Sequence, residues 1–416
     1  MGELIRSRED CRVCGSRRIR QVLSLGKTPL ANEFVRREEV GKPQDRFPLD
    51  VNQCEACGHV QLADVVDPER LFRNYVYVSS TASSFVEHFR RYAEEVIQRA
   101  RLQPGSKVLE IGSNDGTFLR WFREAGMTVL GVDPAEAIAA EASRQGIRMV
   151  PEFFDLALAR RLREQGWEVS LVAANNVFAH VDDLHDLLEG VACLLRPDGL
   201  FVFEASYLLD VVEKGLFDTV YHEHLSYHSV KPLVRLFERH GMELIDVVRV
   251  QTHGGSIRGL AKKRGAAWRR QNRVEELIAL EEACGLYDVA TYTRFAERNQ
   301  GLKEKLAGLL FELKANGKQV DGYGAPAKAT TLMFHFGIGP EALDYIVDDS
   351  PWKQGLYTPG HHIPIVDSSY LYDEGKRPDY LLILAWNFAG GIIERHRAFR
   401  ESGGRFIVPL PEVEIR

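Results

Sequence analysis

The sequence VLEIGSNDGTFL occupies Val108–Leu119, and a second stretch of the same kind, VDGYGAPAKATTL, occupies Val320–Leu332. In each stretch a short apolar run passes through a Gly-rich turn into a segment that suits a helix. This is the pattern of the first strand-to-helix turn of an open α/β sheet, where small molecules bind. Two such turns in one chain predict two α/β units with a cleft between two different ligands. That is the arrangement of a transferase.

The segments around these turns extend the pattern. Strand-like and helix-like runs alternate from Lys107, which predicts an α/β fold with a doubly wound parallel sheet. A charged helical stretch follows, whose Glu–Lys and Glu–Arg pairs at i,i+4 indicate an exposed connector, and Lys318 starts the second α/β unit. We therefore divide the chain into an N-terminal module at 1–70, a central domain at 71–270, a helical connector at 271–316 and a C-terminal domain at 317–416.

Four of the six cysteines form two CxxC pairs, CRVCG and CEACG, each followed by glycine; they are Cys11, Cys14, Cys54 and Cys57. Glycine lets the backbone turn back toward the sulfurs, and two such knuckles provide tetrahedral S₄ coordination of zinc. A closed Cys₄ site leaves no open position, so this zinc is expected to serve folding and not chemistry. The alternative is a pair of redox motifs or free thiols, which rarely occur as matched, Gly-followed pairs.

The length and bulk composition predict a folded chain of two or three domains. The chain has 416 residues and a formal net charge of −6, and 45% of its residues are hydrophobic, which is enough to build real cores. No uninterrupted apolar run reaches the ~18 residues of a membrane helix, and the N-terminus lacks the apolar segment of a secretory signal. We expect a cytoplasmic monomer that binds neither membranes nor nucleic acid.

The first turn resembles that of the class I S-adenosylmethionine (SAM) methyltransferases. It reads Glu110-Ile-Gly112-Ser-Asn114-Asp-Gly116, and the next strand ends at Asp133, where an acidic side chain can bind the ribose of a nucleoside. The family turn is [ED]xGxGxG, so Asn114 stands where the middle glycine is usual. The alternative is another nucleotide-binding α/β domain. The resemblance implies these SAM-binding residues: Glu110, Gly112, Asn114, Gly116, Asp133 and Asn175.

The resemblance narrows when the whole chain is considered. A Cys₄ module, GSNDGTF, YHEHLSYHS, THGGSIR and GYGAPAK occur in this order, as in the nucleotide-sugar C-methyltransferases of deoxysugar biosynthesis. The resemblance implies a small zinc-binding module, a central class I SAM methyltransferase sheet and a C-terminal Rossmann-like domain. It also implies methylation at C-3 of a dTDP-linked 4-keto-2,6-dideoxyhexose, with SAM and structural zinc as cofactors.

The segment Tyr221–His228, YHEHLSYH, is the densest cluster of ionisable groups in the chain. It follows the strand that ends the first alternating series, which is where ligands bind in open α/β sheets. A metal site is the main alternative, but the HExxH spacing is absent. Methylation of a carbon next to a ketone needs a base and a donor to the enolate, and histidine suits the base. The resemblance implies His224 as this base, with Tyr221, Glu223, His180 and Tyr75 around the sugar.

The second turn is predicted to hold the diphosphate of the nucleotide sugar. Pro326 suits the first turn of a helix, and a helix N-terminus with Lys328 nearby favours phosphate groups. His253 and Arg258 are expected to face the cleft. The alternatives are a unit that only buttresses the first and, for THGGSIR, a plain hairpin turn. The predicted substrate-binding residues are Tyr323, Gly324, Ala325, Lys328, Asp348, His253 and Arg258.

Three other functions remain open from the sequence. A C-5 methyltransferase acting on a related 4-keto sugar would need the same parts. An NAD-dependent oxidoreductase or epimerase acting on nucleotide sugars would use a similar sheet, but its GxGxxG turn is missing. A non-catalytic zinc-bearing SAM-binding protein would not need the ionisable cluster at Tyr221–His228.

Overall fold

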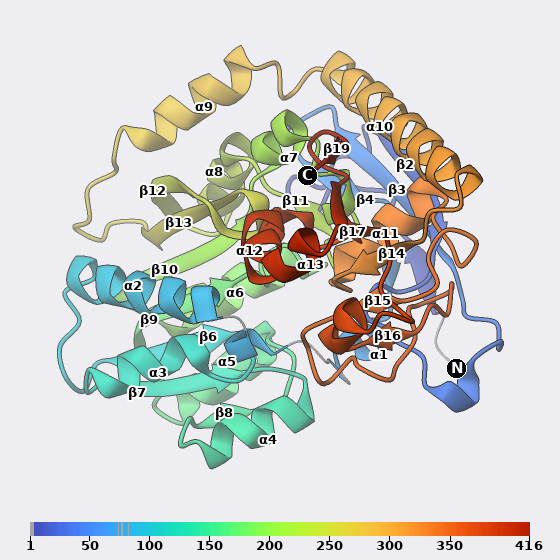
Figure 1. Cartoon of the computed structure of the whole chain (residues 1–416). Coiled ribbons are helices and arrows are strands. Elements are labelled where there is room, and N and C mark those ends of the chain that lie inside the picture. The colour runs from blue at the N-terminus through green and yellow to red at the C-terminus, as the bar shows by residue number, and fades with distance from the viewer. Residues whose placement is uncertain (1–3, 74, 76–77, 82) are drawn as a thin grey trace.

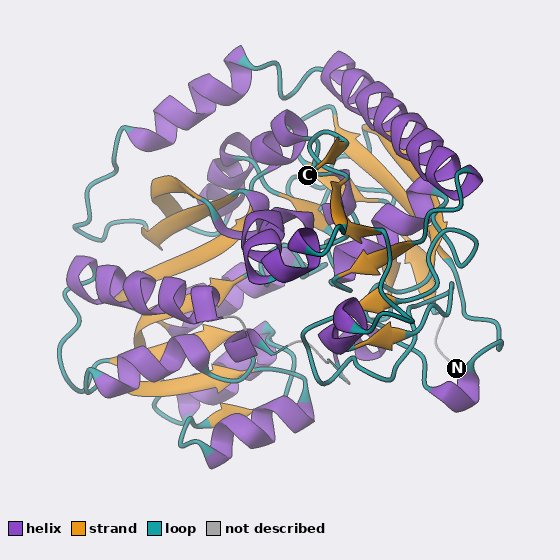
Figure 2. Ribbon diagram, in the orientation of Figure 1, coloured by secondary structure: helices purple, strands orange, loops and turns teal. Residues whose placement is uncertain are grey.

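The computed structural model describes residues 4–73, 75, 78–81 and 83–416. The chain folds into an N-terminal part, a central sheet flanked by helices, a two-helix arm and a C-terminal sheet (Figure 1). Helices and strands alternate through both large sheets (Figure 2), so the α/β fold predicted from the sequence is confirmed. Among the residues that the structure describes, no helix has the length and apolar character needed to cross a membrane.

The N-terminal part is built from short antiparallel strands. Strand β1 (Ile5–Ser7) pairs with β5 (Asp64–Val66), while β2 (Ile19–Thr28), β3 (Phe47–Cys54) and β4 (Val60–Leu62) form a second sheet. The fourth strand of that sheet is β11 (Ser226–Tyr227), which pairs with β4 and comes from the middle of the chain. The 3₁₀ turn η1 (Arg37–Glu39) and helix α1 (Pro68–Phe72) complete this part. The ionisable segment at Tyr221–His228 is therefore attached to the N-terminal sheet.

The central sheet has seven strands in the order β12-β13-β10-β9-β6-β7-β8. Strand β13 runs antiparallel to both of its neighbours, and the other strand pairs are parallel. The strands are β6 (Lys107–Ile111), β7 (Thr128–Val132), β8 (Met149–Val150), β9 (Val169–Asn175), β10 (Leu195–Ser206), β12 (Met242–Val250) and β13 (Ser256–Lys263). The segment RPDG at 196–199 lies inside β10, where the register shifts between Leu195 and Leu200.

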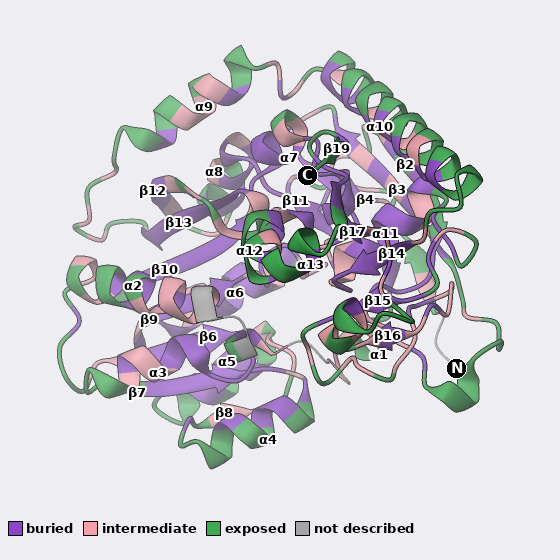
Figure 3. Ribbon diagram, viewed as in Figure 1, coloured by how far each residue is buried: buried purple, intermediate pink, exposed green. Residues whose placement is uncertain are grey.

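Helices cover both faces of this sheet, and its central strands are buried along their length (Figure 3). The elements around it are η2 (Ser79–Thr81), α2 (Ser83–Arg99), α3 (Thr117–Glu124), α4 (Glu136–Arg144), α5 (Leu156–Glu164), α6 (Leu184–Leu194), α7 (Leu208–Lys214), η3 (Phe217–Thr219), α8 (Val230–Arg239) and η4 (Thr252–Gly254). Helix α2 places Phe89, Tyr92 and Val96 against Phe118 and Phe122 of α3, because its apolar residues recur at helical spacing.

The chain then crosses to the C-terminal sheet through α9 (Arg273–Ala283) and the long helix α10 (Val289–Ala315), which contacts β2 and α11 (Ala327–Phe336). The C-terminal sheet has the order β16-β15-β14-β17-β18-β19 and is parallel except for β19. Its strands are β14 (Val320–Tyr323), β15 (Ile346–Val347), β16 (Ile365–Val366), β17 (Tyr380–Ile383), β18 (Arg405–Val408) and β19 (Glu414–Ile415). Its remaining helices are η5 (Ser368–Tyr372), η6 (Trp386–Phe388), α12 (Ala389–Arg395) and α13 (Arg397–Glu401).

One hydrophobic cluster runs through all of these parts. It extends from Cys11 and Leu49 in the N-terminal part, through Phe203 in the central sheet, to Leu382 and Val413 at the C-terminal end. Because the parts share a core, the surfaces between them are packed as interiors are. The division of the chain at residues 70, 270 and 316 into separate domains stays a prediction.

Candidate active site

A cavity of about 770 Å³ is lined by residues from the N-terminal part, the central sheet and the C-terminal sheet. Asn32, the turn after β6 and the start of α11 all contribute to its walls. Of the residues predicted from the sequence, it is lined by Tyr75, Glu110, Gly112, Asn114, Asp133, Asn175, His180, Tyr221, His224, His253 and Lys328. The two Gly-rich turns therefore meet at one cavity, with the ionisable segment between them.

The turn at 110–116 packs tightly against the end of β9. Gly112 has φ 63° and donates its N–H to the Val132 carbonyl at 2.7 Å. A Cβ at Gly112 would lie 2.1 Å from Cγ2 of Val177, so glycine is required here. Asn114 has φ 50°, a left-handed conformation that asparagine tolerates better than most residues. Asparagine can therefore replace the usual glycine without changing the path of the turn.

Two buried acceptors at the carboxyl ends of β6 and β9 face this cavity. Asn175 Nδ2 donates to Glu110 Oε1 at 3.0 Å, and burial raises the pKa of Glu110 well above its ordinary value. Within the described parts of the chain, Glu110 Oε2 and Asn175 Oδ1 are buried without a hydrogen-bond partner. Such a pair suits a ligand group with several N–H donors, as in the ammonium group of SAM.

Asp133 and Gly116 shape the rest of this turn. Asp133 accepts the Asn114 N–H at 2.8 Å and the Ala135 N–H at 2.9 Å, and burial raises its pKa. Each of its oxygens keeps a lone pair for a ribose hydroxyl. Gly116 has φ 74° at the N-cap of α3 and is not among the described residues that line the cavity, so its contribution is to the backbone.

His224 is held in one orientation and one tautomer. Its Nδ1 lies 2.7 Å from the Thr219 carbonyl oxygen, which can only accept, so Nδ1 carries the proton and Nε2 keeps the lone pair. Burial lowers the pKa of His224 to about 4, so the ring is neutral near pH 7. The Tyr221 ring lies 4.0 Å and the His180 ring 5.1 Å from it, measured between ring centroids. Nε2 is therefore unprotonated, with its lone pair available to accept a proton, while burial disfavours the charged form that results.

Glu223 belongs to the same segment as His224, and its carboxylate holds Tyr75 and Asn32 by hydrogen bonds. It is buried and accepts hydrogen bonds from Tyr75 Oη at 3.0 Å and Asn32 Nδ2 at 2.7 Å. Burial raises the pKa of Glu223 to about 7. Glu223 is not part of the cavity wall as described, so it acts on the cavity through Tyr75 and Asn32, which are.

The second turn presents fewer side chains to the cavity than predicted. Lys328 lines it, with Nζ 4.4 Å from the centroid of the Trp386 ring, and burial lowers the pKa of this lysine. Asp348 accepts the Ala325 N–H at 2.6 Å, and Tyr323 Oη lies 2.9 Å from Asp349. The described cavity lining therefore omits four of the predicted residues: Tyr323, Gly324, Ala325 and Asp348.

The hairpin turn after β12 contributes one of its two predicted residues. His253 lines the cavity, and its ring lies 5.1 Å from that of Phe85. Arg258 does not point into the cavity. Its Nε donates to buried Glu204 at 2.8 Å, and its Nη1 contacts Glu95. Arg258 thus forms ion pairs within the central part of the fold, and it is not among the described cavity residues.

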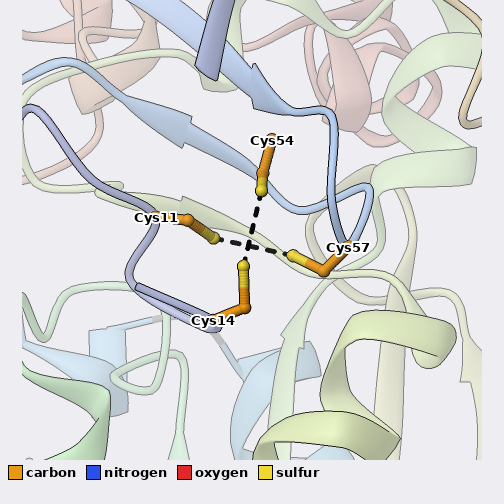
Figure 4. Close-up of side chains that lie close together, drawn as sticks. All are labelled: Cys11, Cys14, Cys54 and Cys57. Atoms are coloured by element: carbon orange, nitrogen blue, oxygen red, sulfur yellow. Dashed lines mark hydrogen bonds between the residues drawn. The ribbon is translucent and has the colours of Figure 1, made fainter. Parts of the chain in front are cut away.

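The four knuckle cysteines converge on one point (Figure 4). All four Sγ atoms lie within 4.8 Å of one another, with Cys11–Cys57 at 3.6 Å and Cys14–Cys54 at 3.5 Å. A tetrahedral zinc with bonds of about 2.3 Å places sulfurs about 3.8 Å apart, so the geometry fits the ion. Three of these cysteines are buried, which suits a structural site.

Three family models match the chain: "Putative zinc binding domain" at residues 11–72, "Methyltransferase domain" at 85–247 and "C-methyltransferase C-terminal domain" at 251–411. The C-methyltransferase NovU of Streptomyces niveus is 39% identical over 415 residues, which cover 100% of this chain and 98% of NovU. The chain belongs to this family of C-methyltransferases. Family membership confirms the predicted reaction class and the predicted cofactors, SAM and zinc.

Solved structures resemble this C-methyltransferase over a smaller region. A SAM-dependent methyltransferase from Clostridium acetobutylicum has 13% identity and a TM-score of 0.36, over 45% of this chain and 94% of that one. Magnesium protoporphyrin IX methyltransferase from Synechocystis, solved with SAM, has 15% identity and a TM-score of 0.33, over 43% and 81% of the two chains. NovU and the C-terminal family model both describe C-methyltransferases. They give no support to the two alternatives from other classes, an NAD-dependent oxidoreductase or epimerase and a non-catalytic SAM-binding protein.

Several cavity residues of the C-methyltransferase were missed in the sequence. Asn32 lies 191 positions from the glutamate that it contacts, and no local motif marks it. Lys353, whose Nζ donates to the Ala325 carbonyl at 2.8 Å, lies in a loop that reads as ordinary surface. Phe153 and Phe154 follow β8, which pairs with β7, the strand that ends just before Asp133. This place at the carboxyl edge of the sheet is the one signal that could have indicated them.

Replacement of Asp133 by alanine is expected to weaken binding of S-adenosylhomocysteine, because the ribose loses a charged acceptor. The loss should be about 1.5–3 kcal/mol, the scale of a hydrogen bond to a charged group. Isothermal calorimetry measures it, with Asp198→Ala, an exposed aspartate far from the cavity wall, as the matched control. Unchanged affinity in Asp133→Ala would place the cofactor elsewhere.

Glu223 makes the stability of the C-methyltransferase depend on pH. Its folded-state pKa of about 7 exceeds the ordinary value of 4.5, so protonation favours the folded state. This contribution is complete below about pH 4.5 and is lost as the pH rises through about 7. We expect the melting temperature of Glu223→Gln to exceed that of wild type at pH 8, where Glu223 is ionised, and not at pH 5, where it is protonated in the folded state. Equal differences at both pH values would contradict the raised pKa.

Proposed function

We propose that this C-methyltransferase transfers a methyl group from SAM to C-3 of a dTDP-linked 4-keto-2,6-dideoxyhexose. One observation supports the proposal above all others: the cofactor turn, His224 and Lys328 line the same cavity. Its volume of about 770 Å³ lies in the upper half of the ~300–1,000 Å³ that is usual for ligand sites.

The cavity residues supply what carbon methylation needs. When bound, SAM provides a methyl group on a sulfonium, which is a good leaving group. The ketone acidifies the neighbouring C–H bond, and His224 Nε2 accepts that proton. Tyr221 and His180, the two rings beside His224, donate to the enolate oxygen, where negative charge develops. Tyr75, fixed by Glu223, closes over the sugar.

The nucleotide end of the substrate is assigned to the C-terminal part. The start of α11 has no side-chain cap at Pro326 and offers the positive end of a helix dipole. Lys328 and Lys353 both line the cavity near this point, and two cations suit a diphosphate. Asp218, which is buried and whose charge opposes the lowering of the Lys328 pKa, helps to keep that lysine charged.

Lys328→Ala is therefore expected to weaken binding of dTDP while leaving the affinity for S-adenosylhomocysteine unchanged. Loss of one charged contact should cost about 1.5–3 kcal/mol. Calorimetry with each ligand alone measures both affinities, and Lys318→Ala, an exposed lysine at the far end of β14, is the matched control. The reverse pattern would mean that the two turns hold each other's ligands.

The proposal is tested by incubating the enzyme with SAM and a panel of dTDP-linked 4-keto sugars. The expected product is heavier by one CH₂ unit, and NMR should find the new methyl group on C-3. A methyl group on C-5 would replace the proposed position. Failure of every sugar in the panel to accept a methyl group would overturn the substrate class.

A further inference from the structure

The first zinc knuckle contains a buried arginine. Arg12 lies between the ligands Cys11 and Cys14, and its side chain is fully buried. Its Nε donates to Asp182 Oδ1 at 2.9 Å and its Nη1 to the Leu62 carbonyl at 2.7 Å. A buried guanidinium must stay paired with its acceptors, because a buried charge without a partner costs free energy. Arg12 is therefore fixed in place by Asp182 and Leu62.

Two further arginines near the N-terminus, Arg6 and Arg8, form ion pairs with Asp182. Arg8 Nη1 donates both to its Oδ1 at 2.9 Å and to its backbone carbonyl at 3.0 Å, and Arg6 forms a further ion pair with Oδ2. Three arginines of the N-terminal part thus converge on one carboxylate in the loop between β9 and α6. Two residues earlier is His180, which lines the cavity and stacks on Phe72 with a centroid distance of 5.6 Å.

The second knuckle reaches the other end of the same loop. His59, two residues after Cys57, lies with its ring 6.0 Å from that of His228. His228 stacks on Phe178 at 4.8 Å, and its Nε2 lies 3.3 Å from the Phe178 carbonyl oxygen. The loop at 178–182 is therefore held at both ends, by groups that the two zinc knuckles position.

We propose that the zinc module positions His180 for catalysis, through the Arg12–Asp182 pair. The module then acts on the reaction as well as on folding. Arg12 is a positioning residue outside the described cavity lining, whereas its partner Asp182 belongs to that lining. This inference rests on the proposed function only for the role of His180 beside His224. Displacing a cavity group by about 1 Å can cost about 10²-fold in rate, so a distant ion pair can matter this much.

Two variants test the pair from its two sides, Arg12→Met and Asp182→Asn. Each is expected to lower kcat by about 10²-fold while KM for both substrates and the zinc content stay near wild type. Arg20→Met is the matched control, because Arg20 also forms an ion pair in this module, with Glu55, but is exposed and does not reach the central sheet. A kcat within about twofold of wild type in zinc-loaded Arg12→Met or Asp182→Asn would overturn the proposal.

Conservative and combined variants separate positioning from general damage. Arg12→Lys keeps the charge but cannot serve both Asp182 and Leu62, so it should recover part of the lost kcat. The double variant Arg12→Met/Asp182→Asn should lose little more than Asp182→Asn alone, because Asp182→Asn already removes the Arg12 pair together with those of Arg6 and Arg8. Losses that multiply would show two independent effects and would overturn the pair. If Arg12→Met does not fold, Arg12→Lys decides, because Asp182 lines the cavity and its variant also changes the cavity wall. An unchanged kcat in zinc-loaded Arg12→Lys would then overturn the proposal.

A readout without sugar substrate separates this inference from the proposed function. In the complex with S-adenosylhomocysteine, the imidazole NMR signal of His180, assigned with His180→Gln, should shift in Arg12→Met and Asp182→Asn and not in Arg20→Met. An unmoved signal would overturn the positioning role even if wild-type enzyme methylates the panel. A moved signal supports it even if no sugar of the panel is methylated, in which case only the substrate proposal fails.

Discussion

His224→Asn is expected to lose both methyl transfer and proton exchange at the substrate carbon, each by about 10²–10⁴-fold, the usual contribution of a general base. Asparagine can keep the hydrogen bond to the Thr219 carbonyl through its amide, but it offers no basic nitrogen where Nε2 stands. Exchange is measured in heavy water with S-adenosylhomocysteine in place of SAM, by following the C-3 hydrogen of the 4-keto sugar by NMR. Wild-type enzyme should wash this hydrogen out.

The variant should still bind both ligands, because the proposed role of His224 concerns the proton and not the nucleotide. His335→Asn is the matched control, since this histidine packs against Phe217 and is not among the described residues of the cavity wall. Near-normal turnover by His224→Asn would remove His224 from the mechanism. Suspicion would then move to His180, because His222 points its Nε2 at the Phe47 carbonyl oxygen, 3.2 Å away.

Removal of zinc is expected to unfold the N-terminal part and abolish activity. Structural zinc sites bind with about 10–16 kcal/mol, which is comparable to the whole stability of a domain. Cys54→Ser should lower both the zinc content and the melting temperature, and metal analysis of wild type should give about one zinc per chain. The loss should spread to the cavity, because Asn32 and β4 belong to the same part of the chain.

Cys284→Ser provides the control for this experiment, because Cys284 is an exposed free cysteine outside the knuckles. It should leave zinc content, melting temperature and turnover unchanged. A metal-free preparation that is fully stable and active would show that the four sulfurs serve another purpose.

Features of local origin could be predicted from the sequence. The Gly-rich turn, the strand before it and the acid at the end of the next strand follow from rules that act within about 25 residues. The zinc ligands were equally predictable, because each CxxC–Gly knuckle is a self-contained turn. The cluster at Tyr221–His228 was found because its composition alone is unusual.

Features that depend on docking could not be predicted. Arg258 was expected in the cleft, but it lies opposite Glu204 in the register of β10 and β13, a pairing that no local pattern shows. Asp348 was expected to face a ligand, and it instead braces the second turn through the Ala325 N–H. Which side chains of a turn meet the cavity depends on how two sheets pack, and this is set by the shared core.

The pairing of β11 with β4 constrains how such enzymes can be recombined. The strand after His224, β11, completes a sheet whose other strands lie near the N-terminus. These two stretches of the chain therefore form one structural unit. An exchange of residues 1–72 between relatives should succeed only when the stretch around Tyr221–His228 travels with them. A chain that begins at α2 should retain the Gly-rich turn after β6 but lose the strand β4 that holds the segment after His224 in place.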